Sequence, residues 1–204
     1  MEKEFIESNI VILGDLKPSF YDKLFFVKNN LISEDSFLDS TIITPSLVRI
    51  ITNDIAINIE TTKIVIVNKT RKQNDFIKDI TLKIITQSSF DFEAIGFNYK
   101  WFIFLPDIHE HTKTRFWNSS NTKLNSHFDS DNSAYGYYVS RDFLDARMKL
   151  DIKPGVLKEV DSNNSKLILN LDYNLHFEKE YIMKSIESYD VYSSKVSEIT
   201  KDYE

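Results

Sequence analysis

Three long stretches in the second half of the chain alternate between apolar and polar positions. In 95–105 every second residue is large and apolar, and the same period of two recurs over 144–152 and 167–177. This period is typical of a β-strand with one buried face, because successive side chains point to opposite sides of a strand. We therefore predict three long strands in this half.

The first half combines shorter strands with helical spacing. An apolar run over 9–16 predicts a strand, and the runs over 47–52, 55–60 and 63–68 predict a three-stranded meander with short turns. Over 20–31, apolar residues recur at intervals of three and four, which predicts an amphipathic helix. Helical spacing is therefore expected before the meander.

Two further segments have helical spacing. Apolar residues are spaced by four over 74–87, which predicts a second helix. Apolar residues at similar spacing after Glu178 predict a last helix near the end of the chain. The resulting order is β-α-β-β-β-α, followed by β-β-β-α. It predicts an α+β fold of antiparallel sheets with helices packed on one face.

The chain is expected to form a single compact domain over 1–204. The halves 1–89 and 90–204 have similar predicted content, which indicates a pseudo-repeat, and no linker rich in Pro, Gly or Ser separates them. The segment 106–134 follows neither period, so we expect an irregular insertion there.

Composition excludes several classes of protein. The 204 residues contain no cysteine, so disulfides, thiolate metal sites and cysteine nucleophiles are ruled out. A net charge of −6 argues against a protein that binds nucleic acid over its whole surface, because binding to phosphates needs concentrated Lys and Arg. No run approaches the roughly 20 apolar residues of a membrane span. We expect a cytoplasmic protein with no membrane partner.

The insertion contains a candidate metal site. Asp107, His109 and His111 alternate, so an extended backbone would place them on one face, and His127 with Asp129 repeats the spacing. Imidazole and carboxylate together suit zinc or another divalent metal, which could activate a water for hydrolysis. The alternative interpretation is a polar loop that collects His and Asp without binding a metal, and no cofactor is then expected.

No nucleophilic or phosphate-binding motif accompanies this site. No serine lies in a Gly-X-Ser-X-Gly elbow, and the chain has only four glycines, too few for a Gly-rich phosphate loop. Catalytic residues are therefore not assigned.

Aromatic residues in and beside the insertion form a candidate partner-binding set. Trp, Tyr and Arg supply much of the binding energy in protein interfaces. The set consists of Arg115, Phe116, Trp117, Tyr135, Tyr137 and Tyr138. The alternative interpretation is that these rings cap the core of the sheet.

Three strand-like stretches are "IVILGDL", "AIGFNYKWFIFLP" and "LILNLDYNLHF". Together they resemble an uncharacterised, sporadically distributed bacterial protein family with two sheet-and-helix halves. The second resembles that family's Gly-X-(Arg/Asn)-Tyr strand, although Lys100 and Trp101 follow Tyr99 where the family has an Asn-Arg pair. The resemblance implies a β-α-β-rich fold and a binding role in a bacterial defence or stress system.

Two functional hypotheses follow. The first is a non-enzymatic binding or adaptor protein that engages a protein partner, or itself as a homo-oligomer, through sheet edges and the aromatic residues. The second is a metal-dependent hydrolase or nuclease that uses the His and Asp residues of 106–134. A third option is small-molecule binding in a groove between the halves, for which the sequence distinguishes no residue.

Overall fold

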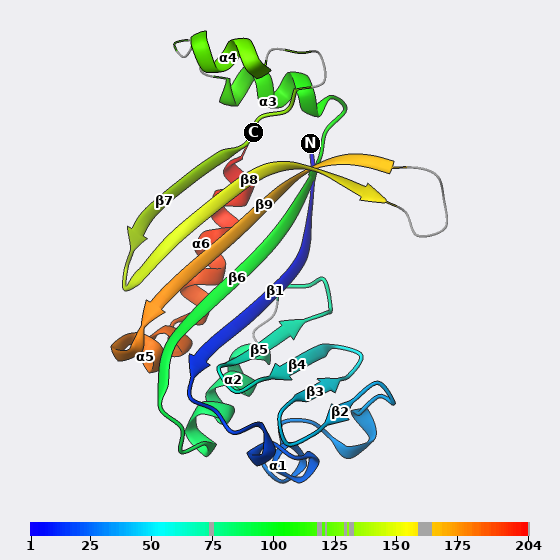
Figure 1. The fold of residues 1–204 in the computed structure, drawn as a ribbon, viewed down its shortest axis with the longest axis vertical. Coiled ribbons are helices and arrows are strands. Elements are labelled where there is room, and N and C mark those ends of the chain that lie inside the picture. Colours follow the sequence, from blue (N-terminus) through cyan, green and yellow to red (C-terminus); the bar gives the residue numbers. More distant parts are fainter. Residues whose placement is uncertain are drawn as a thin grey trace.

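A single antiparallel sheet organises the protein (Figure 1). The computed structural model describes residues 1–73, 76–117, 120, 122–128, 130, 133–158 and 165–203. In these residues the strands are β1 (Glu2–Gly14), β2 (Ile42–Ile43), β3 (Val48–Ile51), β4 (Ile55–Ile59), β5 (Lys63–Asn68), β6 (Phe92–Phe104), β7 (Tyr137–Phe143), β8 (Ala146–Lys158) and β9 (Ser165–Glu178). Their spatial order is β2-β3-β4-β5-β1-β6-β9-β8-β7.

The helices are α1 (Lys23–Lys28), α2 (Phe76–Gln87), α3 (Ile108–Phe116), α4 (Thr122–Phe128), α5 (Ile182–Glu187) and α6 (Tyr189–Asp202). Figure 1 shows α5 and α6 behind the sheet, and α2 contacts α5 in the same layer. The predicted mixed α+β class with antiparallel strands is therefore confirmed.

The central pair of strands joins the two halves of the chain. β1 and β6 pair antiparallel along almost their full lengths, and β1 begins at Glu2, well before the predicted start at residue 9. Residues 2–8 belong to the strand because they pair with the second half of β6, from Tyr99 to Phe104. One continuous ladder of hydrogen bonds therefore crosses from β2 to β7.

The core lies between the sheet and the helices. Phe97 and Phe177 of neighbouring strands are fully buried, with ring centroids 4.9 Å apart. From α6, Tyr189 packs 5.0 Å from Phe97 and Tyr192 packs 4.9 Å from Phe177. Such offset or edge-to-face aromatic pairs add to the stabilisation from apolar burial.

Two local expectations are wrong. The helix expected over 20–31 is interrupted: a 3₁₀ turn covers Pro18–Phe20, and α1 begins afterwards because the Asp22 side chain accepts a hydrogen bond of 2.7 Å from the amide of Phe25. The described part of 106–134 is not an irregular insertion, because it contains α3 and α4 at one end of the sheet (Figure 1).

Within the described residues, no helix combines the length and apolarity that crossing a membrane requires.

Candidate functional site

The predicted partner-binding residues meet where α3 ends and β7 begins. Phe116 stacks on Tyr137, with centroids 5.5 Å apart and ring planes 11° apart, and Trp117 packs edge-on against Tyr135 at 4.8 Å. The amide of Tyr135 donates a 3.3 Å hydrogen bond to the hydroxyl of Thr112, which ties the chain entering β7 to α3. We call Phe116, Trp117, Tyr135 and Tyr137 the aromatic cluster.

The other two predicted residues lie beside the cluster without joining it. The guanidinium of Arg115 lies 5.8 Å from the ring centroid of Tyr203, near the end of the chain. Tyr138 follows Tyr137 on the strand and so points to the opposite face of the sheet, where it is 60% exposed. Tyr137 and Tyr138 thus lie on opposite faces of β7, and only Tyr137 joins the cluster.

β7 forms an edge of the sheet. It pairs with β8 on one side, and among the described residues no strand pairs with its other side (Figure 1). Tyr137 is 49% exposed and Val139 is 39% exposed, so the first half of the strand presents large apolar groups as well as its backbone. An edge of this kind is a template for a further strand.

A hollow lies beside this edge, on the side of the helices. It has a volume of about 580 Å³ and is lined by Phe143, Asp190, Val191, Ser194, Lys195 and Glu198. Phe143 ends β7 and the other residues belong to α6, so the hollow separates the edge strand from the helix. Val191 is half exposed there, which leaves an apolar wall facing solvent.

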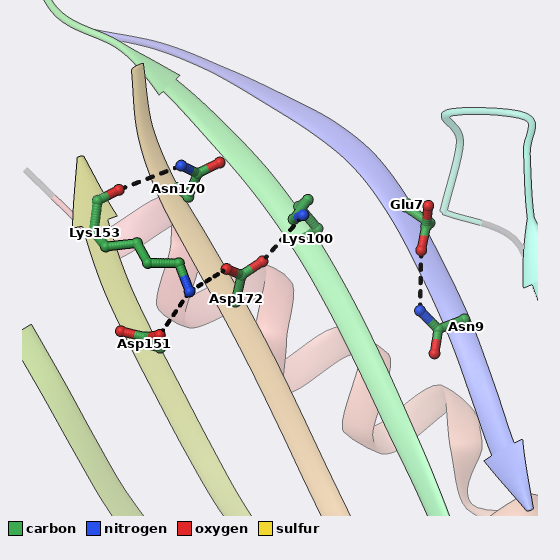
Figure 2. A network of polar contacts seen from close by, with 7 residues as sticks. All are labelled: Glu7, Asn9, Lys100, Asp151, Lys153, Asn170 and Asp172. Carbon is green, nitrogen blue, oxygen red and sulfur yellow. Dashed lines mark hydrogen bonds and ion pairs between the residues drawn. The ribbon is translucent and has the colours of Figure 1, made fainter. Parts of the chain in front are cut away.

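The helix-free side of the sheet carries polar side chains. We call this surface the polar face; it comprises Glu7, Asn9, Asn98, Lys100, Tyr138, Lys149, Asp151, Lys153, Asn170, Asp172 and Asn174. Figure 2 shows several of them pointing from β1, β6, β9 and β8 to the same side. Most of them surround a hollow of about 320 Å³.

One row of the polar face is a ladder of amides. The Asn174 amide donates to the Asn98 oxygen at 2.7 Å, and the Asn98 amide donates to the Asn9 oxygen at 2.8 Å. The Asn9 amide in turn donates to a Glu7 carboxylate oxygen at 3.0 Å, as Figure 2 shows. Each bond fixes the orientation of the next side chain across three adjacent strands.

A second row carries alternating charges. Asp151 lies directly opposite Asp172, and the ammonium of Lys153 sits between them, 2.8 Å from the first carboxylate and 3.3 Å from the second (Figure 2). Hydrogen bonds to both carboxylates raise the pKa of Lys153 above its ordinary value. Lys100 approaches Asp172 from the other side at 3.7 Å. The lysines thus separate like charges that would otherwise repel across the ladder.

The predicted metal ligands do not assemble in the described structure. They lie on and before a helix and not on an extended backbone, so successive odd-numbered side chains point to different sides of α3. The Asp107 carboxylate caps α3 by accepting from the amide of Glu110 at 2.9 Å. Asp129 lies outside the described residues, and within them no three His, Asp or Glu side chains form a group that could hold a metal ion.

The three histidines of this region have separate surroundings. His109 lies 3.2 Å from the carbonyl of Ser133, and His111 lies 3.0 Å from the Tyr203 hydroxyl. Burial, with a smaller effect of Arg115, lowers the pKa of His111. His127 is exposed on α4. The described contacts of His109 and His111 are structural, since they hold α3 against the segments before β7 and after α6.

The polar face is the part of the site that the sequence interpretation missed. A signal for it exists, because Asn98 and Lys100 occupy the polar positions of the clearest alternating stretch. Asn and Asp are depleted from strands, and their presence in the middle of several long strands is the feature that points to this surface.

No protein-family model matches the chain, and no curated protein sequence is significantly similar to it.

Proposed function

We propose that the protein is a non-enzymatic binding or adaptor protein whose partner docks on the free edge of β7. The observation that carries this proposal is the edge itself: within the described residues its outer side has no strand partner, while Tyr137 and Val139 remain exposed on it. Soluble proteins commonly protect such edges, and an unprotected one indicates pairing with another chain.

The surroundings of β7 favour an extended peptide as the docked segment. A segment added to the sheet forms backbone hydrogen bonds with the edge, and its alternate side chains enter pockets on either side. The hollow between β7 and α6 can receive such side chains, with Phe143 and Val191 as apolar walls. The aromatic cluster at the start of β7 supplies anchoring side chains of the kind that dominate binding energy.

The partner is proposed to be another protein, and a second copy of the chain is the alternative occupant. Antiparallel pairing of two β7 strands would give a homodimer with a continuous sheet. Light scattering during size-exclusion chromatography separates these outcomes, because a homodimer doubles the mass of the purified protein as its concentration rises, whereas an adaptor for another protein stays a monomer.

Selection from a displayed library of random peptides tests the proposal. Peptides that bind should alternate between apolar and other residues. Val139→Lys places a charge on the edge strand and should weaken the binding of the selected peptides at least about tenfold. A tenfold change corresponds to about 1.4 kcal/mol of binding free energy. Ile42→Lys is the matched control, since Ile42 is 44% exposed on the opposite edge strand β2.

Two results would count against the proposal. One is a protein that selects no peptide and remains monomeric at every concentration. The other is a set of selected peptides whose affinity is lowered by Ile42→Lys and not by Val139→Lys, because the functional edge would then be β2. Equal melting temperatures of both variants would show that neither change acts through unfolding.

A pseudo-repeat of the halves 1–89 and 90–204 is part of the proposal. Its support is the strand order: β3, β4 and β5 extend outward from β1, and β7, β8 and β9 extend outward from β6 in the corresponding arrangement. Helices follow the last strand of each half. If the halves are equivalent, β7 corresponds to β3, whose outer side is covered by the short strand β2, whereas β7 has no such cover among the described residues.

The cellular setting proposed is the cytoplasm of a bacterium, in a defence or stress system. It rests on the family resemblance of the three strand sequences and on the short apolar runs of the chain. The genes encoded beside this one provide the direct check. A metal-dependent hydrolase or nuclease has no supporting group of ligands among the described residues, so we propose a single function.

A further inference from the structure

The polar face is built from residue types that are disfavoured in β-strands. Asn and Asp are among the residues most depleted from β-strands, because their short polar side chains compete for backbone hydrogen bonds. On this face they occupy the interiors of four adjacent strands, at Asn9, Asn98, Asp151, Asn170, Asp172 and Asn174. Positions where local preference is broken are expected to be functional sites.

The register of the sheet brings these residues together. Asn98 lies opposite Asn9 on one neighbouring strand and opposite Asn174 on the other, and Lys149 lies opposite Asn174. Directly opposed side chains share a face and lie about 5 Å apart. The result is a contiguous polar surface that spans the β1–β6 junction between the two halves.

Hydrogen bonds hold this surface in one arrangement. The ladder from Asn174 through Asn98 to Asn9 ends on the Glu7 carboxylate, so each amide has a fixed direction. An amide nitrogen carries two protons and an amide oxygen has two lone pairs, so each internal rung of the ladder keeps one donor and one acceptor for another molecule. The groups are preorganised, which reduces the entropy lost on binding.

The charges of the polar face balance. Three carboxylates, those of Glu7, Asp151 and Asp172, are interspersed with three ammonium groups, those of Lys100, Lys149 and Lys153. An anionic ligand such as a phosphate would meet the carboxylates as well as the lysines, whereas phosphate sites concentrate cations or backbone amides. The arrangement therefore favours a neutral ligand rich in hydrogen-bonding groups.

We propose that the polar face binds a neutral saccharide. A sugar hydroxyl both donates and accepts, so neighbouring hydroxyls match a surface on which amides, carboxylates and ammonium groups alternate. The hollow of about 320 Å³ lies within the range of small-ligand sites, about 300 to 1,000 Å³. Tyr138, exposed at the rim, offers a ring against which the apolar face of a sugar can stack.

Nuclear magnetic resonance titration of the whole protein tests this site. The probes are D-glucose, D-galactose, D-mannose, N-acetyl-D-glucosamine and maltose at millimolar concentrations, with inorganic phosphate as the anionic probe. The result expected is a saturable shift of the side-chain amide signals of Asn9, Asn98 and Asn174 with at least one sugar and none with phosphate.

Two variants locate the binding. Asn98→Thr removes the middle of the ladder, and Tyr138→Ala removes the exposed ring without touching the core; each should weaken sugar binding by about tenfold. The control is Asn58→Thr, which lies in β4 on the same side of the sheet and bonds Arg49 at 3.1 Å, outside the ladder. Matching melting curves for Asn98→Thr and the natural protein establish that the fold is kept.

The site would be overturned if no sugar of the panel shifted these signals, if phosphate bound in their place, or if Asn58→Thr weakened binding as much as Asn98→Thr and Tyr138→Ala. The inference is independent of peptide docking at the edge. Val139 lies opposite Leu150 on the helix side of the sheet, so Val139→Lys should leave sugar binding unchanged.

Discussion

The two halves of the sheet differ most on the side that has no helices. In the first half this side carries Val11, Val65 and Val67, β-branched residues that suit a strand, together with Asn9 and Asn58. In the second half Asn98, Asn174 and Asp172 occupy neighbouring positions on this side. The helix side is predominantly apolar in both halves, with Ser8 and Asn68 as a buried polar pair in the first. The scaffold is thus similar throughout, and the chemistry that departs from strand preference is concentrated in β1, β6, β8 and β9.

The two edges of the sheet also differ. β2 is two residues long, whereas β7 has seven residues and a regular register with β8 over 137–143. A very short edge strand is one way in which proteins avoid pairing with other chains. This contrast is the one expected if β2 is a protected edge and β7 is the docking edge that we propose.

Replacing Phe97 with alanine tests most severely whether the halves fold as one unit. This ring is fully buried in the core between β6 and α6, and Phe→Ala changes of this kind cost about 3–5 kcal/mol of unfolding free energy. Urea unfolding followed by amide exchange should show β4 and β9 losing protection together. Separate transitions, with β4 unaffected, would mean that the halves are independent.

A buried tyrosine in each half allows a matched comparison. The Tyr173 hydroxyl accepts a 2.9 Å hydrogen bond from Thr200, which is buried, whereas Tyr21 shares a 2.9 Å bond with the half-buried Ser88. Tyr173→Phe leaves a buried hydroxyl without a partner and should cost about 1–3 kcal/mol, and Tyr21→Phe about 0.5–1.5 kcal/mol. Denaturant melts of both variants give the two values, and equal costs would show that Ser88 is as enclosed as Thr200.

These tyrosines also set a pH dependence. Burial raises the pKa of each from 10.0 to about 12. Because the folded protein favours the neutral phenol, this contribution to stability is complete below pH 10 and is lost as the pH rises from about 10 to about 12. Tyrosinate absorbance in an alkaline titration should show one fewer late-ionising tyrosine in Tyr21→Phe, and likewise in Tyr173→Phe, than in the natural protein. If Tyr21 and Tyr173 both ionised near pH 10, the burial described for them would be contradicted.

Lys153→Met probes the charged row and should have the smallest effect. Removing the ammonium leaves Asp151 facing Asp172, but the side chains are partly exposed, so the cost should be about 0.5 kcal/mol or less. The first-half control is Lys63→Met, since the 3.3 Å pair of Lys63 with Glu60 separates no like charges. High salt should remove the difference between the two variants, whereas a difference that persisted would point to a non-electrostatic cause.

Much of the fold could be predicted from the sequence because most strands have one buried face. The expected strands at 55–60 and 63–68 correspond to β4 and β5, and the helix expected over 74–87 corresponds to α2. β7 was missed because an edge strand exposed on both faces has no alternation of apolar and polar residues. α3 was missed because it touches the end of the sheet and buries only Ile108 and Thr112.

The candidate site was only partly predictable. The aromatic residues stood out by type, but their division between two faces depends on β7 being a strand. The polar face depends on the register of four strands that lie far apart in the chain, which periodicity does not determine. The unusual Asn and Asp residues were visible in the sequence, whereas their alignment required the paired sheet.

Amide hydrogen exchange of β7 is the most direct test of partner docking at the free edge. The measurement compares the protein alone with the protein bound to a peptide selected as described above. We expect new protection of backbone amides within 137–143 and none at 42–43, because an added strand pairs with outward-facing amides of the edge it joins. A bound peptide that left 137–143 unprotected would contradict docking at β7.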